Sequence, residues 1–277
     1  MVSLLALSAA LFWGTGDFLG GLTSRRLHVL AVLAVSQAVG LAGVVLWVAG
    51  ARDPFPGFLE LLPAGAAGVA GLVGLAALYR GLAVGAMGIV APISAASPIV
   101  PLAVDASHGD TPGAWQWGGV ILVLSGIVLL SYESSPDRTE RIAAGVGLAL
   151  VAALGFGGFV VGLDAGADES APWAVVAARS TSVMLAVVAA LVVSTSLRPP
   201  RSLVPALLGV GVFDTAANVC VALATTKGAA GIVAVLSALY PVVTVLLARF
   251  LLAERLSSTR RIGGVVALVG AALVAAG

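Results

Sequence analysis

The chain has 277 residues, of which 60% are hydrophobic and only 10% are charged, and its formal net charge is +1. Soluble domains carry about 25% charged and about 45–50% apolar residues, so this composition excludes a protein that covers its whole surface with polar groups. We therefore interpret the chain as an integral membrane protein, with the bilayer as its apolar solvent. The small net charge also predicts that nucleic acid is not a partner.

A membrane-spanning helix needs about 20 mostly apolar residues. Ten stretches of the chain meet this requirement. In chain order they are Ser3–Leu22, Val29–Ala49, Leu59–Tyr79, Ala86–Val104, Ala114–Tyr132, Ile142–Leu163, Trp173–Ser194, Leu203–Ala224, Ala229–Leu252 and Arg261–Ala276. We predict an all-α integral membrane protein with ten transmembrane helices. The most polar connection, Glu133–Arg141, is expected to be a linker near the middle of the chain.

The fourth and ninth spans are related to each other, because one stretch of sequence occurs in both. Gly88–Pro98 reads G-I-V-A-P-I-S-A-A-S-P, and Gly231–Pro241 reads G-I-V-A-V-L-S-A-L-Y-P, 143 positions later. The same shift carries Trp13 and Gly14 to Phe156 and Gly157. A unit of roughly half the chain is therefore duplicated.

We place the two five-helix repeats at residues 1–138 and 139–277. Five is an odd number, so the second repeat must enter the membrane from the opposite side. Inverted repeats are typical of secondary transporters, whose substrate site lies near the midplane between the repeats. The alternative is that duplication only enlarged a helical bundle, as in a non-transporting receptor or assembly protein. A membrane enzyme is a third possibility.

The first span and the ninth span carry a family resemblance. The first contains A-A-L-F-W-G-T-G-D-F-L-G, and the ninth reads G-A-A-G-I-V-A-V-L-S-A-L-Y-P-V-V-T-V-L-L-A-R-F-L-L-A-E-R-L-S. These segments resemble the EamA group of the drug/metabolite transporter superfamily, and the resemblance covers nearly the whole length. It implies the inverted-repeat transporter fold but no particular substrate. The first repeat departs from the pattern, because Gly109-Asp110-Thr111 replaces the motif Ala253-Glu254-Arg255.

Positive charges are a guide to membrane orientation. Predicted loops on the side of the N-terminus hold Arg52 and Lys227. Those on the other side hold Arg25, Arg26, Arg80, Arg138, Arg141, Arg198, Arg201, Arg249, Arg255, Arg260 and Arg261. The count taken alone places both termini outside the cytoplasm, whereas the resemblance implies cytoplasmic termini, so the sequence assigns no orientation.

Two prolines occupy equivalent positions in the two repeats. Pro98 and Pro241 each remove an amide donor and leave the carbonyl four residues earlier, that of Ser94 or Ser237, without its helical partner. We interpret both prolines as hinge candidates and both serines as candidates for lining a cavity. The alternative is a plain kink in which each serine binds its own backbone.

Charged residues inside spans are the sharpest functional signal, because each costs at least about 2.5–3.5 kcal/mol at the centre of an isolated helix. At about 1.5 Å per residue, Arg179 and Asp214 lie roughly 10 and 14 Å from the surface on the N-terminal side, on consecutive helices. Asp17 comes out nearer the other side. Asn218 lies one turn from Asp214 on the same face.

Two interpretations of the Arg179–Asp214 pair stay open. It is a static ion pair that fastens two helices, or it is a cavity pair in which Asp214 binds a proton or cation and Arg179 binds a substrate carboxylate. For Asp17 the alternative is capture by Thr15 or by a wet helix end. Further candidates for a pocket are Trp13, Gln37, Tyr79, Phe213 and Tyr240, although aromatic residues near span ends also anchor helices at the interface.

No pattern in the sequence indicates catalysis. His28 and His108 lie in loops without a second metal ligand at helical spacing, and no nucleotide-binding or hydrolase motif is present. We predict no enzyme activity, no cofactor and no metal. The expected function is secondary transport of a small organic metabolite, amino acid or drug, with protons and membrane lipid as the other partners. We expect a multi-pass protein in the cytoplasmic membrane of a bacterium. A monomer is compatible with the sequence, which assigns no oligomeric state.

Overall fold

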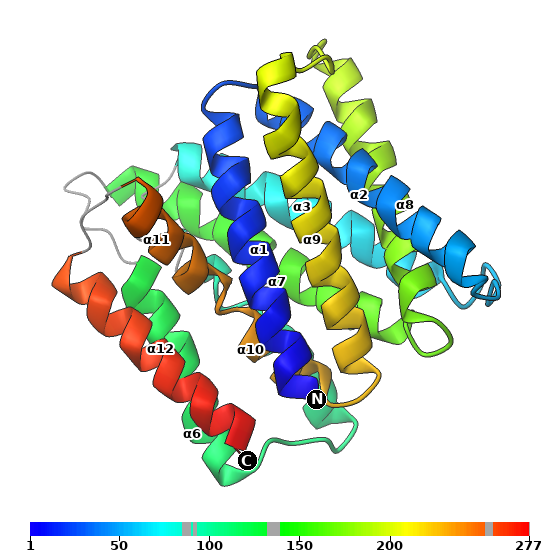
Figure 1. The fold of residues 1–277 in the computed structure, drawn as a ribbon. Coiled ribbons are helices and arrows are strands. Elements are labelled where there is room, and N and C mark those ends of the chain that lie inside the picture. The colour runs from blue at the N-terminus through cyan, green and yellow to red at the C-terminus, as the bar shows by residue number, and fades with distance from the viewer. Residues whose placement is uncertain (85–89, 91–92, 132–138, 253–256, 277) are drawn as a thin grey trace.

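The structure is a computed structural model that describes residues 1–84, 90, 93–131, 139–252 and 257–276, and it is built of helices throughout this part (Figure 1). The helices are, in chain order, α1 Val2–Ser24, α2 Val29–Ala51, α3 Leu62–Val84, α5 Ile99–Ser107, α6 Ala114–Ser131, α7 Thr139–Ala165, α8 Ala171–Val192, the short 3-10 helix η1 Arg201–Leu203, α9 Val204–Thr225, α10 Ala230–Ser237, α11 Tyr240–Leu251 and α12 Ser258–Ala276.

The helices have the length and surface of membrane spans. Within the described residues, seven helical stretches are long and apolar enough to cross a bilayer, and two shorter apolar helices accompany them. Large apolar side chains face outward along these helices, for example Leu46, Leu154 and Phe250, which are 73%, 63% and 75% exposed. Such a surface is stable when lipid covers it. The protein is therefore an integral, multi-pass membrane protein.

Local sequence signals set several helix ends. The Nδ1 atom of His28 accepts a hydrogen bond from the N–H of Leu30 at the start of α2. The hydroxyl of Ser170 accepts one from the N–H of Trp173 at the start of α8. Helices α8, α9 and α11 also have a proline in the first turn, where the missing N–H has no intrahelical partner to lose.

Helix packing repeats itself between the two halves of the chain. Helix α1 packs along α9, and α3 packs along α7. The shift of 143 positions carries α1 to α7 and α3 to α9, so these two contacts correspond. The agreement extends to atoms: a Cβ atom on Gly14 would lie 2.5 Å from Cβ of Val243, and one on Gly157 would collide with Cβ of Val100. The molecule therefore has the two-repeat architecture that the duplication predicts.

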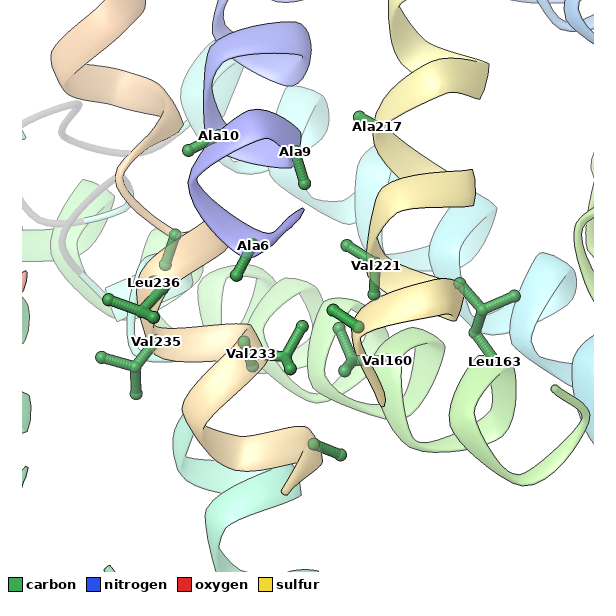
Figure 2. Close-up of a cluster of buried hydrophobic side chains, with 14 of the residues drawn as sticks. Ala6, Ala9, Ala10, Val160, Leu163, Ala217, Val221, Val233, Val235 and Leu236 are labelled. Atoms are coloured by element: carbon green, nitrogen blue, oxygen red, sulfur yellow. The ribbon is translucent and has the colours of Figure 1, made fainter. Parts of the chain in front are cut away.

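The core lies where α1, α7, α9 and α10 meet (Figure 2). Helices α9 and α10–α11 have the largest buried shares among the candidate spans, 50% and 56% of their most apolar stretches. Small residues such as Ala6, Ala9 and Ala217 line the contacts and are fully buried. Small side chains let helix backbones approach closely, which is the main source of packing energy in lipid. This core holds the polar residues described below at fixed positions.

The predicted ninth span, Ala229–Leu252, is not one continuous helix. Helix α10 ends at Ser237 and α11 begins at Tyr240, because Pro241 has no N–H to donate to the carbonyl of Ser237. The fourth span has the equivalent break, and α5 begins directly after Pro98. The first part of that span, including Gly88, lies outside the described residues.

One expected consequence of the break is wrong. The carbonyl of Ser94 is not left open by Pro98, because it accepts a hydrogen bond from the N–H of Ser97 at 3.2 Å. The chain tightens into a turn that bonds three residues apart instead of four. A tightened turn is a common way to satisfy the last carbonyls of a helix.

The linker between the halves is also shorter than predicted. Helix α7 begins at Thr139, inside the predicted linker Glu133–Arg141. Thr139, Glu140 and Arg141 contain no helix-breaking residue, so the apolar helix that follows extends back through them. Residues 132–138 of the linker lie outside the described part.

Asp105 fastens α5 to the start of α10. Its Oδ2 atom accepts the N–H of Gly231 at 2.6 Å. We expect Asp105→Ala to lower the free energy of unfolding by about 1–2 kcal/mol, because a carboxylate at a helix N-terminus is lost. Asp105→Asn should lose less, since its amide oxygen can still accept the bond. Thermal unfolding in detergent measures both. An equal loss in Asp110→Ala, which removes an exposed carboxylate nearby, would contradict the assignment.

Candidate functional site: a buried polar cluster between the repeats

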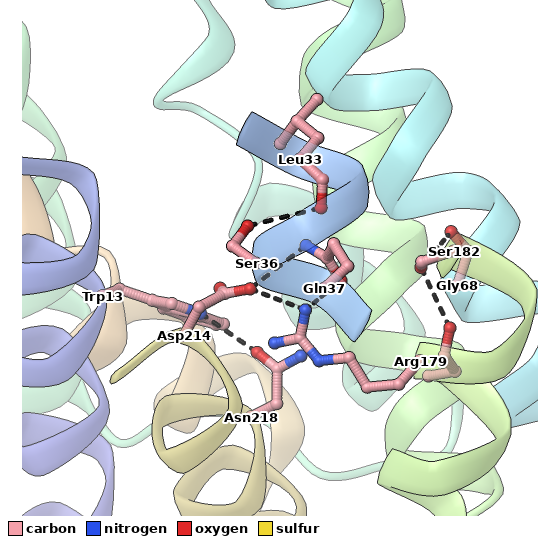
Figure 3. Close-up of polar contacts among 10 residues, drawn as sticks. Trp13, Leu33, Ser36, Gln37, Gly68, Arg179, Ser182, Asp214 and Asn218 are labelled. Atoms are coloured by element: carbon pink, nitrogen blue, oxygen red, sulfur yellow. Dashed lines mark hydrogen bonds and ion pairs between the residues drawn. The ribbon is translucent and has the colours of Figure 1, made fainter. Parts of the chain in front are cut away.

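Three polar side chains from three helices meet in the interior of the bundle (Figure 3). Nη1 of Arg179, on α8, lies 2.6 Å from Oδ2 of Asp214, on α9. Gln37, on α2, links the two: its Nε2 donates to Oδ2 of Asp214 at 3.2 Å, and its Oε1 accepts a bond from Nη1 of Arg179. The ion pair that helical rise predicts is therefore present, with Gln37 as a third member.

Close contacts between backbones fix the helices that carry the cluster. A Cβ atom on Gly211 would collide with the carbonyl oxygen of Ser36, so α9 lies directly against α2. The hydroxyl of Thr181 donates to the carbonyl of Gly65 at 2.8 Å, and that of Ser182 donates to the carbonyl of Gly68 at 3.0 Å. These bonds hold α8 on α3. The guanidinium therefore projects from a well-anchored helix.

The cluster is unevenly shielded from solvent. The side chain of Arg179 is 4% exposed, and that of Asp214 is 28% exposed. Within the described part of the chain, Nε and Nη2 of Arg179 have no hydrogen-bond partner although both are buried. Leaving a buried donor unpaired costs about 1–3 kcal/mol. The guanidinium is thus held by one of its nitrogen atoms and has unused binding capacity.

A second polar contact lies one turn further along α9. Nε1 of Trp13 donates to Oδ1 of Asn218 at 3.0 Å. The ring of Trp13 packs edge-on against Tyr240 and near Phe159, with centroids 6.3 and 6.5 Å apart. The structure thus brings together Trp13, Asn218 and Tyr240, three of the residues predicted as candidates for a substrate pocket. Phe159 was not expected here, because the repeat shift pairs Trp13 with Phe156.

Asp17 lies on the bundle side of α1. At about 100° per residue, Asp17 shares a narrow sector of the helix with Ala6 and Ala10, which are buried. Asp17 is nevertheless exposed. A Cβ atom on the neighbouring Gly16 would lie 3.6 Å from the backbone nitrogen of Asp214, so this part of α1 packs against α9 near the cluster. Thr15 does not capture the carboxylate of Asp17, since the hydroxyl of Thr15 donates to the carbonyl of Leu11 at 2.8 Å.

The two serine candidates bond within their own helices. The hydroxyl of Ser94 donates to the carbonyl of Val90 at 2.9 Å, and that of Ser237 donates to the carbonyl of Ala234 at 3.2 Å. Both serines are buried and bind their own helices, as in the plain-kink alternative. The side chain of Tyr79 lies outside the described part. Among the described residues, no three His, Cys, Asp or Glu side chains group as metal ligands.

Replacing the prolines tests whether the breaks act as hinges. Pro98→Ala and Pro241→Ala restore an N–H donor, and we expect both to slow transport severalfold without preventing membrane insertion. Flux in reconstituted vesicles is the measurement. Pro205→Ala is the matched control, because Pro205 lies in the first turn of α9, where no break occurs. Unchanged flux in both hinge variants would show that the breaks only shape the bundle.

Apolar spans and a packing pattern that repeats between the two halves define a multi-pass membrane protein built of two repeats. A model of the EamA-like transporter family matches residues 1–132 and 143–276. The chain therefore belongs to the EamA-like transporter family, within the drug/metabolite transporter superfamily.

Comparison with other proteins supports the fold but does not identify a substrate. A solved crystal structure, described only as that of a protein, shares 20% sequence identity with this chain and has a TM-score of 0.80. The match covers 98% of this chain and 95% of that chain, so the two folds agree over almost their whole length. No curated protein matches the sequence.

Proposed function

We propose that this protein is a secondary active transporter that moves a small organic metabolite, amino acid or drug by alternating access of two inverted five-helix repeats. The observation that supports the proposal is that both repeats contribute residues to the polar cluster. Gln37 and Trp13 come from the first repeat, and Arg179, Asp214 and Asn218 come from the second. Substrate sites of such transporters lie between the repeats near the midplane. The proposed location is the cytoplasmic membrane of a bacterium.

The two ends of the bundle differ in a way that fits alternating access. On the side of the termini, α5 and α10 are joined by the Asp105–Gly231 bond. Toward the other side, Asp17 is exposed on the inner face of α1. We infer that the transport cycle breaks the Asp105–Gly231 bond on the side of the termini and buries Asp17 toward the other side. Pro98 and Pro241, where the fourth and ninth spans are broken, are the proposed hinges.

Proton coupling is the proposed source of energy, with Asp214 as the proton site. Asp214 is partly exposed and bonded to both Arg179 and Gln37, so a proton on its carboxylate would weaken these bonds. We expect Asp214→Asn to abolish the dependence of transport on pH, because an amide cannot titrate. Flux in vesicles with an imposed pH gradient measures this. Asp17 is the other carboxylate nearby, and Asp17→Asn serves as the matched comparison.

The deciding experiment has two steps. A thermal-shift screen of the detergent-purified protein against a metabolite library finds ligands, since binding to the folded state alone raises its apparent stability. Radiolabelled hits are then tested for flux in proteoliposomes, with empty vesicles as the control. A non-transporting receptor built on the same bundle would bind a ligand and move none of it. That outcome would contradict the proposal.

A further inference from the structure

The guanidinium of Arg179 uses its donors unevenly. Of its five N–H groups, those of Nη1 have partners, the carboxylate of Asp214 and the amide oxygen of Gln37. Nε and Nη2, which carry the remaining N–H groups, are buried and have no acceptor among the described residues. Arg179 as a whole is 3% exposed. Bulk water therefore has almost no access to these donors.

The unused donors form a bidentate edge of the guanidinium. One N–H of Nη2 and the N–H of Nε point in parallel, and this fork matches the two oxygens of a carboxylate. An ion pair that only fastened α8 to α9 would be stronger with Asp214 in two parallel bonds on this fork than in contact with one nitrogen. Asp214 instead lies at Nη1, 2.6 Å away, and leaves the fork unused. Asp214 thus holds the guanidinium through Nη1, while the Nε–Nη2 edge has no acceptor among the described residues.

We propose that the Nε–Nη2 edge of Arg179 binds the carboxylate of the transported ligand in a bidentate manner. That the ligand is transported rests on the proposed function, whereas the carboxylate site itself rests on the geometry of Arg179. Asp214 and Gln37 orient the guanidinium from the Nη1 side, so they act as positioning residues for this contact. Neutral and purely cationic molecules lack a pair of anionic oxygens, so we expect them to bind this edge more weakly than a carboxylate does.

Matched pairs of small acids and amides test the proposal without knowledge of the natural ligand. The probes are acetate with acetamide and benzoate with benzamide, titrated into the detergent-purified protein at constant ionic strength while thermal unfolding is followed. The variants are Arg179→Gln, Arg179→Lys and Asp214→Asn. Arg198→Gln is the control, because Arg198 is an exposed arginine outside the helices.

The acids should raise the unfolding temperature of the wild type and of Arg198→Gln, and the amides should not. Arg179→Gln should weaken benzoate binding about 10- to 100-fold, the value of hydrogen bonds to a charged group. Arg179→Lys should also weaken it, since an ammonium cannot form the fork. Asp214→Asn should weaken it less than Arg179→Gln does, because the fork remains although one of the groups that orient it has changed. If Arg179→Gln does not fold, Arg179→Lys and the comparison of acids with amides still show whether this edge binds a carboxylate.

Equal shifts by acids and amides, no shift by either acid up to high millimolar concentration, or shifts that persist in the Arg179 variants would overturn the carboxylate site. Flux assays separate this outcome from failure of the proposed function. Arg179-dependent flux of a neutral compound would keep the transporter and reject the carboxylate. Arg179-dependent binding of benzoate, with no compound moved by the reconstituted protein, would keep the carboxylate site and reject the transporter.

Discussion

Arg179→Gln and Asp214→Asn should each lower the free energy of unfolding by about 3–5 kcal/mol, the usual effect of removing one partner from a buried ion pair. The loss should be larger for Asp214→Asn, because Arg179 is the more deeply buried of the two groups and would be left as an uncompensated charge. The double variant should be less destabilised than either single variant. Thermal and denaturant unfolding in detergent provide these values, with Arg198→Gln as the control for a change at an exposed arginine.

Transport separates the two interpretations of the pair. The double variant should fold and insert, yet move no ligand, because the anion-binding group and the proton-binding group are both gone. Flux in proteoliposomes, normalised to inserted protein, is the measurement. A double variant with near-normal flux would mean that the pair only fastens α8 to α9.

Gly119→Ala should destabilise the protein strongly, whereas Gly118→Ala, one residue earlier on the same helix, should not. A Cβ atom on Gly119 would lie 2.7 Å from the carbonyl oxygen of Gly270 and 2.8 Å from the backbone nitrogen of Val274. Backbone atoms cannot move aside as a flexible side chain can, so α6 and α12 must separate. We expect a loss of about 1–3 kcal/mol or more, as for other overpacked contacts.

The neighbouring position is a closely matched control. No described atom lies within 4 Å of a Cβ atom on Gly118, and alanine is the better helix former by about 1 kcal/mol, so Gly118→Ala should be neutral or stabilising. Gly270→Ala tests the same crossing from the other helix, since its Cβ atom would lie 2.5 Å from the backbone nitrogen of Val123. Similar stabilities for Gly118→Ala and Gly119→Ala would contradict this account of the α6–α12 contact.

The sequence predicted those features that depend on one helix at a time. Hydropathy located the described spans to within a few residues at most ends, and the shift of 143 positions correctly linked Gly14 with Gly157. Helical rise placed Arg179 and Asp214 at similar depths, and the structure brings them into contact. Depth is a property that a single span carries in its own sequence.

Features that depend on which helices are neighbours could not be predicted in the same way. Nothing in the sequence around Gln37 indicates that α2 packs against both α8 and α9 beside the two charged residues. The position of Phe159 beside Trp13 likewise follows from the packing of α7, which duplication does not specify at the level of side chains. The prediction of an open carbonyl at Ser94 was wrong because the N–H of Ser97 donates a hydrogen bond to it.

The division of the polar cluster between the halves has an evolutionary consequence. A protein made of two identical half-length chains would place the same residues on both sides of its symmetry axis. In this chain the repeat shift pairs Arg179 with Ser36, Asp214 with Gly71 and Gln37 with Ser180, so neither half contains the complete set. Two copies of the second half would bring together two arginine–aspartate pairs without Gln37, and two copies of the first would contain neither Arg179 nor Asp214. Once its residues had diverged in this way, the fused gene could no longer return to a half-length homodimer with the same site.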